Sequence, residues 1–576
     1  MIRAVFTLFV VFLAFDAFAQ QPGMPGGTPR PTGPLPGARV QRPPRDPRET
    51  PTGTAVIRGR IVAADTGTPI RRAQVRVFSP EVRDNRGTST DAQGRFELRD
   101  LPAGRWELVA SKAGFVTLRY GQRRPREGGQ PIEVADGETM ARANLALPRG
   151  AVVTGRVLDE FGEPVAGARV QAMRHQAMQG TRQLMPVGGD GTDDTGAFRI
   201  YGLMPGDYYI SAVASQMGMF ADNTNDTTGY APTYYPGTGN LAEAQRVTVA
   251  VGQEVTNVTF PLLATKVVRI TGTVTDSKGE RLANGFLMLQ DASETAGGMF
   301  MGRPGGQIRP DGSFTISNVT AGAYTLTVNT AMGMGGPGSE APEFASMRLT
   351  VGNEDITGIN IVTSKGATVN GAIVVAPGSV GNPNLAGMMV ISQSSRPNML
   401  GPGGGPAKVE QDGTFRLQVQ GGERLFRVMN LPPTWMLKTV TLNGDDITDR
   451  PMEFKGNEDV TGLQIVVTDR VPEVNGKVTT PRGEPTRDYT VVIFPEDSKK
   501  WGFPSRYIRS GRADQDGMFK IRALPPDEPY LAVAVDYLED GEGGDPEFLE
   551  QIKDRATRLS ITDGEIKALD LKLITR

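Results

Sequence analysis

The side chains that most often perform catalysis are scarce in this sequence. The chain of 576 residues contains one histidine, His175, and no cysteine. A zinc peptidase needs several His and Glu ligands, and a Ser-His-Asp triad needs a histidine beside a nucleophilic serine. His175 stands in a polar segment rich in Met and Gln, without a nucleophile-elbow motif. We therefore interpret His175 as a solvent-exposed imidazole and predict no catalytic residue, no metal ligand and no cofactor.

Acidic residues are abundant, but their spacing does not define a site. Asp514–Gly517 and Asn443–Asp446 resemble fragments of calcium loops, yet neither has the twelve-residue spacing with a terminal bidentate Glu. Asp and Asn side chains also accept hydrogen bonds from turn amides, which accounts for both segments. A carboxylate pair for glycoside cleavage depends on spatial position, and nothing singles out two of the 64 acidic residues.

Aromatic residues in segments rich in Pro and Gly are the better indication of a binding function. Flat rings presented on loops can stack on the apolar faces of sugar rings while their polar edges meet hydroxyl groups. The alternative is that such rings close the end of a sandwich or pack between neighbouring modules. Two clusters are the candidate carbohydrate-binding residues: Tyr230, Tyr234 and Tyr235, and Trp501, Phe503 and Tyr507.

A basic run offers a second candidate binding site. Residues Arg119–Arg126 read Arg-Tyr-Gly-Gln-Arg-Arg-Pro-Arg, and Arg123 and Arg124 lie at the centre of the run. Such a run can bind an anionic glycan or form a solvated loop. The net charge of the whole chain is −2, which predicts no general attraction to nucleic acid or to an anionic membrane.

The elements that must position these residues repeat about once per hundred residues. Each copy has an Asp/Gly turn, an alternating Phe-x-aliphatic run, a second turn and a large apolar residue, as in Asp193–Tyr208. Alternation of apolar and polar residues is typical of a half-buried strand. From the turn glycine to the large apolar residue the offset is twelve in Gly94–Trp106, Gly196–Tyr208, Gly312–Tyr324 and Gly413–Leu425, and thirteen in Gly517–Tyr530. A fixed offset predicts one hairpin that recurs in five modules.

Length and composition agree with several all-β domains. The chain is longer than the roughly 250–300 residues at which one core stops growing, and its 72 Gly and 43 Pro separate short alternating runs. Strands with turns every 8 to 12 residues or so are typical of antiparallel sandwiches. We predict an all-β tandem array of about five antiparallel β-sandwich modules, prealbumin-like or Ig-like. The predicted modules cover residues 54–149, 150–265, 266–365, 366–470 and 471–576.

Two kinds of segment depart from this pattern. Asp545 can cap a helix and Pro546 suits its first position, so a short helix is predicted near 546–555. Segments without clear periodicity, among them 175–191 and 215–241, are predicted to be loops that carry any binding function.

The N-terminal segment has the features of an export signal. Residues 1–19 combine Arg3, a short apolar core and the cleavage-site pattern Ala17-Phe18-Ala19. Residues 20–53 are rich in Pro and Gly and predict a disordered linker. The apolar core is shorter than the roughly 20 residues that span a membrane, so we predict no transmembrane span after signal cleavage. The expected location is the periplasm, the outer cell surface or the medium.

Several motifs together resemble a known family. They are the opening Gly155-Arg156-Val157 strand, the turn at Gly162–Ala168, the Asp-x-x-Gly-x-Phe turn and the Pro-Gly-x-Tyr turn at 205–208. They resemble the carboxypeptidase regulatory-like domains of secreted bacterial proteins, with a transthyretin-like or carbohydrate-binding-like sandwich, over residues 54–574. Gly421-Gly422-Glu423 departs from the Pro-Gly turn. The resemblance implies this fold and an association with carbohydrate binding or cell-surface assembly, and it implies no enzymatic activity.

These observations combine into one functional hypothesis with two alternatives. We predict an exported, non-enzymatic rod of five modules whose end loops bind polysaccharide or a cell-envelope protein. The first alternative is a structural spacer or an assembly scaffold at the cell surface. The second is an envelope hydrolase that uses a carboxylate pair.

Overall fold

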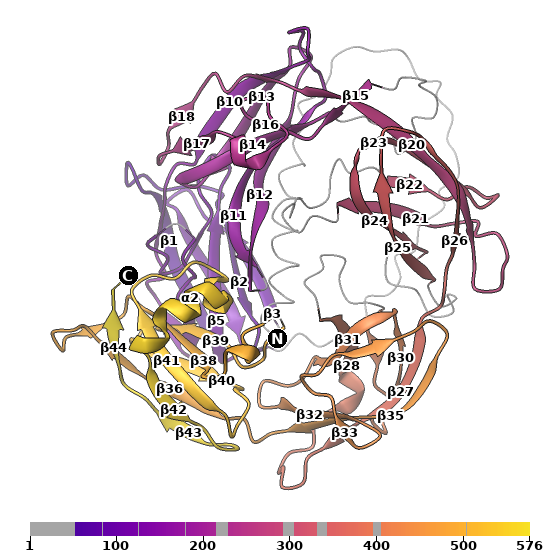
Figure 1. The fold of residues 1–576 in the computed structure, drawn as a ribbon. Helices are drawn as coiled ribbons and strands as arrows, with labels where there is room; N and C mark the ends of the chain where they lie inside the picture. The colour runs from indigo at the N-terminus through magenta and orange to yellow at the C-terminus, as the bar shows by residue number, and fades with distance from the viewer. Residues whose placement is uncertain are drawn as a thin grey trace, which may run out of the picture.

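The computed structural model describes residues 52–82, 84–124, 126–178, 180–214, 228–291, 305–330, 343–395, 405–502 and 504–575. The predicted signal peptide, nearly all of the predicted linker and Phe503 lie outside these residues. The chain folds as five successive β-sandwich modules (Figure 1), so the predicted tandem all-β architecture is confirmed. Within the described ranges, no helix is long and apolar enough to cross a membrane.

Modules 1 and 2 each have two sheets. In module 1, one sheet holds β4 (Arg95–Leu101), β1 (Ala55–Ala63), β8 (Thr139–Met140) and β9 (Leu145–Leu147), and the other holds β3 (Asp84–Ser89), β2 (Gln74–Ser79), β5 (Gly104–Ser111), β6 (Leu118–Arg119) and β7 (Ile132–Val134). In module 2, one sheet holds β13 (Ala197–Leu203), β10 (Ala151–Leu158), β18 (Glu254–Val255) and β19 (Phe260–Pro261), and the other holds β12 (Thr181–Gly191), β11 (Arg169–Met178), β14 (Gly206–Val213), β16 (Thr233–Tyr234) and β17 (Arg246–Val249).

Modules 3 and 4 repeat the two-sheet plan with different edge strands. Module 3 has β23 (Ser313–Thr320), β20 (Leu263–Thr275), β26 (Ile356–Val362) and β15 (Thr228–Ala231) opposite β22 (Gly305–Gln307), β21 (Phe286–Asp291), β24 (Gly322–Asn329) and β25 (Phe344–Val351). Module 4 has β30 (Thr414–Val419), β27 (Ala367–Val375), β35 (Asp459–Thr468), β32 (Met436–Leu442) and β33 (Asp445–Asp446) opposite β29 (Ala407–Lys408), β28 (Met389–Ser394), β31 (Gly422–Met429) and β34 (Met452–Phe454).

In module 5 the two sheets are continuous, because the strand Leu571–Ile574 pairs with a strand of each sheet. Their order is β37 (Pro485–Thr486), β36 (Glu473–Thr479), β44 (Leu571–Ile574), β41 (Pro529–Val535), β38 (Thr490–Pro495) and β39 (Arg509–Arg512), with β40 (Met518–Arg522) and β43 (Ile566–Ala568) on β36 and β42 (Thr557–Ser560) on β41. The helix α2 (Pro546–Ile552) lies in the segment where the sequence predicts one. Asp545 caps it by accepting a hydrogen bond from the amide of Glu547 at 3.0 Å.

The first strand of every module pairs antiparallel with the repeated Phe-x-aliphatic strand and parallel with the strand that closes the module. In module 2, β10 pairs antiparallel with β13, through Gly155 opposite Phe198, and parallel with β19, through Val157 opposite Phe260. The equivalent parallel pairs are β1 with β9, β20 with β26, β27 with β35 and β36 with β44. The parallel pair is a departure from the purely antiparallel expectation, and it joins the two ends of each module.

A glycine in each first strand makes this arrangement possible. A Cβ atom at Gly155 would lie 1.8 Å from the carbonyl oxygen of Val258 and 2.9 Å from the ring of Phe198. The same two neighbours, a carbonyl of the closing segment and the Phe of the repeated strand, surround the other four glycines, which are Gly59, Gly272, Gly371 and Gly476. The glycine therefore lets the closing segment and the buried Phe approach the first strand together.

The repeated turn is held by its aspartate, as the sequence predicts. In module 2 the Oδ1 atom of Asp193 accepts hydrogen bonds from the amides of Thr195 and Ala197, both at 2.9 Å. The hydrogen bond from the Thr195 hydroxyl, followed by these two, lowers the pKa of Asp193. In modules 3 and 4 the aspartate stands directly before the glycine instead, and Asp311 accepts from the amide of Ser313 at 2.9 Å. One hairpin is thus built with two turn sequences.

The segment 175–191 is not a loop, contrary to the sequence-based expectation. β11 and β12 form a long hairpin in which His175 pairs with Leu184. Met173, Leu184 and Met185 are buried, so apolar contacts hold the hairpin although its alternation is interrupted by a bulge between Ala172 and Met173. The hairpin extends the second sheet of module 2 toward module 5, where Gly541 approaches β11.

The expectation of a rod is wrong, because the modules close into a ring in which module 5 packs against module 1 (Figure 1). Arg512 on β39 forms an ion pair with Glu127 of module 1 at 3.0 Å, and these side chains are 5% and 4% exposed. Around this pair, Arg119 contacts Asp540 at 2.6 Å. The basic run of module 1 thus meets acidic residues of module 5.

The glycine contact leads to a stability prediction for module 5. In Gly476→Ala, the added Cβ would lie 2.0 Å from the carbonyl oxygen of Leu569, and overpacking of this kind costs about 1–3 kcal/mol. We expect faster hydrogen exchange in peptides covering β36 and β44, measured by mass spectrometry. Gly502→Ala is the control, because no atom lies within 4 Å of its added Cβ. Equal exchange in the two variants would contradict the proposed constraint.

The ring closure leads to a prediction about shape. Arg512→Gln leaves Glu127 without its buried cationic partner, and breaking a buried ion pair costs about 3–5 kcal/mol. We expect modules 1 and 5 to separate, so that the radius of gyration from small-angle X-ray scattering increases while circular dichroism stays unchanged. Arg558→Gln is the control, because Arg558 pairs with Glu496 inside module 5. An unchanged radius of gyration for Arg512→Gln, at low and at high salt, would exclude this role for the pair.

Candidate functional site

The three candidate tyrosines lie at the junction of modules 2 and 3. β15, which contains Tyr230, pairs with β20 of module 3, whereas β16, which contains Tyr234, pairs with β14 of module 2. Tyr235 packs edge-on against Phe260 with ring centroids 5.9 Å apart, and the Tyr230 hydroxyl donates to Glu160 at 2.7 Å. The three residues therefore contribute to the packing of the junction, and sugar stacking by them stays a prediction.

The two described residues of the second aromatic cluster, Trp501 and Tyr507, are packed inside module 5 and against module 4. Trp501 is 4% exposed, and its Nε1 donates to the carbonyl of Pro495 at 2.8 Å. The hydroxyl of Tyr507 donates to Asp449 of module 4 at 2.8 Å. Burial, and then the negative charge of Asp449, raises the pKa of Tyr507 to about 12. Both rings have structural contacts, and their binding of sugar also stays a prediction.

Arg123 and Arg124 lie in the contact between modules 1 and 5. Arg123 pairs with Asp488. Arg124 pairs with Asp536 at 3.5 Å, and its guanidinium group lies 5.4 Å from the ring centroid of Tyr537. The two candidate anion-binding residues therefore already have acidic partners within the chain.

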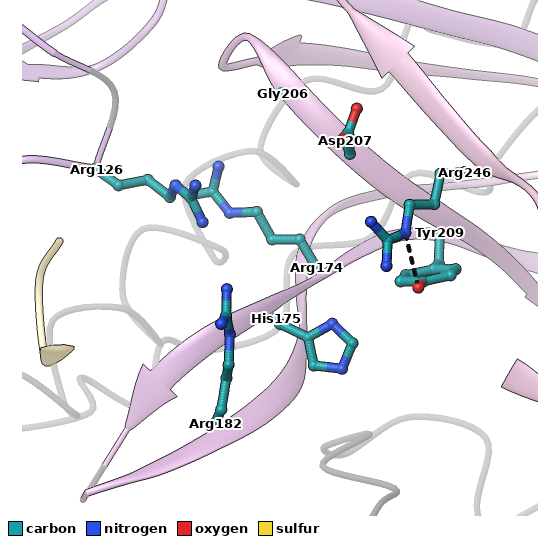
Figure 2. Close-up of a pocket in the computed structure, with 8 residues that line it drawn as sticks. All are labelled: Arg126, Arg174, His175, Arg182, Gly206, Asp207, Tyr209 and Arg246. Atoms are coloured by element: carbon teal, nitrogen blue, oxygen red, sulfur yellow. Dashed lines mark hydrogen bonds between the residues drawn. The ribbon is translucent and has the colours of Figure 1, made fainter. Parts of the chain in front are cut away.

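A pocket that the sequence reasoning did not identify lies where module 2 meets module 1. Its volume is about 580 Å³. Most of its lining comes from β11, β12, β14 and β17, and one residue, Arg126, comes from module 1. Figure 2 shows the lining residues, which are Arg126, Arg174, His175, Arg182, Gly206, Asp207, Tyr209 and Arg246.

Tyr209 organises one side of the pocket. The Nε atom of Arg246 donates to its hydroxyl at 2.9 Å, and the Arg246 guanidinium lies 5.4 Å from the ring centroid (Figure 2). The ring of His175 meets Tyr209 edge-on, with centroids 5.9 Å apart. Behind them Tyr209 packs with Met173 and Leu184 in a small apolar cluster. The imidazole and the Arg246 guanidinium are thereby held in place.

The electrostatics of the pocket are strongly positive. Four guanidinium groups face a single lining carboxylate, Asp207, which accepts a hydrogen bond from the Thr248 hydroxyl at 2.6 Å. Burial lowers the pKa of His175, and the charges of Arg182 and Arg246 lower it further. Both effects favour the neutral imidazole. Burial also lowers the pKa of Arg174.

The arrangement is suited to holding an anion. Guanidinium groups bind carboxylate, sulfate and phosphate through paired N–H donors. Glycoside cleavage instead uses two carboxyl groups, and the lining contains one. Over the described ranges, no group of three His, Cys, Asp or Glu residues is placed to hold a metal ion.

The pocket could not be read from the sequence, because its arginines come from four separated positions. Arg174 and Arg182 meet only through the register of the β11–β12 hairpin, and Arg246 joins them because β17 pairs with β14. One sequence feature could have indicated a pair of strands in place of a loop. It is the group of apolar residues Met173, Leu184 and Met185, which the structure buries.

Three solved structures that resemble the chain are distant likenesses. The Bacillus anthracis TIE protein is 11% identical over 69% of this chain and 68% of its own, with a TM-score of 0.14. The minor pilin GBS52 of Streptococcus agalactiae is 14% identical over 36% of this chain and 95% of its own, with a TM-score of 0.20. A streptococcal ancillary pilin is 12% identical over 53% of this chain and 98% of its own, with a TM-score of 0.18. Likenesses of this size carry no argument about function.

Comparison with protein families gives one match. No curated protein matches the chain. Residues 56–148, which form module 1, match the carboxypeptidase regulatory-like domain, the family that the sequence motifs resemble. The first of the five β-sandwich modules is therefore similar to the carboxypeptidase regulatory-like domain.

Proposed function

We propose that this protein is an exported, non-catalytic binding protein of the cell envelope and that it binds polysaccharide in the pocket between modules 1 and 2. The pocket is the observation that carries the proposal. Its volume of about 580 Å³ falls in the range of about 300–1,000 Å³ that is usual for small-ligand sites. Such a site would take a few sugar units of a longer chain.

The chemistry of the lining supports a sugar ligand. His175 supplies aromatic surface, which can pack on the apolar face of a sugar ring, and the buried ring of Tyr209 supports it from one side. The arginines supply N–H donors for its hydroxyl oxygens. Because the hydrogen bond from Arg246 and the contact with His175 fix these groups around Tyr209, little side-chain freedom would be lost on binding.

Export is part of the proposal and rests on the sequence. The apolar segment and the cleavage-site pattern of residues 1–19 favour secretion. A location at the cell envelope would place the pocket where polysaccharides are abundant.

An assembly scaffold is the second candidate, and the ring closure favours it. The buried Arg512–Glu127 pair fixes module 5 against module 1, so the ring presents its outer surfaces in constant relative positions. In this function the pocket would have no ligand, and protein partners would bind elsewhere on the ring.

Affinity electrophoresis of the full chain through gels containing soluble polysaccharides tests the proposal, together with pull-down on insoluble cell-wall fractions. We expect retardation by at least one polysaccharide. His175→Ala should weaken that binding about fivefold, which corresponds to about 1 kcal/mol, because it removes an aromatic surface of the pocket.

Tyr201→Ala is the matched control, because Tyr201 is an aromatic residue of the same module, is 47% exposed and lies outside the pocket. An equal loss in both variants would argue against the pocket as the site. No retardation and no pull-down would refute polysaccharide binding and leave the scaffold as the remaining function.

A further inference from the structure

The geometry points to the chemical class of the ligand: we infer that the pocket binds an acidic glycan, with an anionic substituent of the sugar held by Arg174, Arg182 and Arg246. The anionic group is a carboxylate, a sulfate ester or a phosphate ester, which share the oxygen pairs that guanidinium groups bind. This inference rests on the proposed polysaccharide-binding function and specifies its ligand.

The first observation is that, in the described part of the chain, three arginines of the pocket have no ion-pair partner, although Asp207 also lines it. Among the described residues, Arg174, Arg182 and Arg246 form no salt bridge with a carboxylate. In the nearby contact between modules 1 and 5, by contrast, arginines have acidic partners, as Arg512 has Glu127. Like charges brought together at a partly buried site repel each other. A bound anion would offset this repulsion.

The second observation is a buried donor that points to a missing acceptor. The Nε atom of Arg174 is buried and has no hydrogen-bond partner in the part of the chain that the structure describes. Its Nη1 atom makes only a long contact of 3.4 Å with the hydroxyl of Tyr208. A buried unsatisfied donor costs about 1–3 kcal/mol, and more when it is charged. An oxygen of an anionic ligand would satisfy it.

The third observation is the convergence of the guanidinium groups. Figure 2 shows Arg182 of β12 and Arg246 of β17 directed toward the space beside His175, whereas Arg126 points toward the guanidinium of Arg174. The Nε of Arg246 is already used by Tyr209, which leaves its Nη groups for a ligand. Arg126 is paired with Glu539 of module 5 at 2.5 Å and so forms the more neutral rim.

A glycan is favoured over a nucleic acid by the extent of the basic surface. A nucleic acid is bound along a continuous basic groove that follows its backbone. Here the basic run that could extend the pocket is occupied by module 5, through contacts such as Arg119 with Asp540. The arginines that remain surround one pocket beside His175 and Tyr209.

The test compares charged and neutral probes on the full chain. Isothermal titration calorimetry would measure binding of oligogalacturonate, its methyl ester, dextran sulfate, unmodified dextran and inorganic phosphate. We expect oligogalacturonate or dextran sulfate to bind at least about tenfold more tightly than its uncharged counterpart, which corresponds to about 1.4 kcal/mol. The affinity should fall as salt increases, because ionic attraction is screened. The carboxylated and sulfated arms identify which anion the pocket prefers.

Single-arginine variants then test whether the preference for the charged probe arises in the pocket. Arg182→Gln and Arg246→Gln should each weaken binding of the charged probe about tenfold. Arg199→Gln is the control, because Arg199 lies on β13 of the same module and does not line the pocket. An equal loss with Arg199→Gln would show nonspecific attraction to basic surface and would overturn the inference.

Other outcomes separate the ligand class from the proposed function. If neutral and charged probes bind equally and His175→Ala weakens both, the protein binds polysaccharide but the acidic class is wrong. If no glycan binds, both the function and the inference fail. A single-stranded oligonucleotide that displaces the charged glycan and depends on Arg182 and Arg246 would reassign the pocket to nucleic acid.

Discussion

The contact that closes the ring is centred on the buried ion pair between Arg512 of module 5 and Glu127 of module 1. Removing two charges from water costs several kcal/mol for each ion, and only good geometry with further hydrogen bonds compensates for it. Here the Glu127 carboxylate also accepts the amides of Arg123 at 3.0 Å and Arg124 at 3.1 Å. Arg512 in turn donates to the carbonyl of Gly128. Because these two residues belong to the first and last modules, their pair is the buried part of the contact that closes the ring, beside the more exposed pairs that Arg119, Arg123 and Arg124 form with acidic residues of module 5.

The same contact positions part of the pocket. Arg126, next to Glu127, has φ of 64°, a left-handed conformation that is uncommon for a residue with a side chain. Its carbonyl accepts the amide of Asp540 of module 5 at 2.9 Å. A Cβ atom on Gly541 would lie 2.1 Å from the carbonyl oxygen of Ala177 on β11. Modules 1, 2 and 5 therefore meet at the pocket, and no single module contains it.

The features of this molecule that could be predicted are those that depend on the spacing of residues close together in the sequence. The constant offset from Gly196 to Tyr208 and its equivalents predicts the module and its hairpin, because strand and turn chemistry act over a few residues. The ring was not predictable in this way, since Arg512 and Glu127 are far apart in the sequence and either residue alone resembles a solvated charge. The hairpin of β11 and β12 was missed because a bulge interrupts its alternation. Because this hairpin was not predicted, the pocket was not predicted either, since its arginines come together only through the pairing of the strands.

The difference between the modules lies in what covers the second sheet. The position after the large apolar residue of the repeat is Leu531 in module 5, where Trp501 and the helix α2 cover it. In module 1 it is Glu107, whose pKa is raised by burial and, to a smaller extent, by the charge of Asp540. In module 2 it is Tyr209, which lines the pocket. One structural position thus serves core packing in module 5 and a candidate binding site in module 2. Repetition of the fold therefore does not imply repetition of the side chain, or of its role, at an equivalent position.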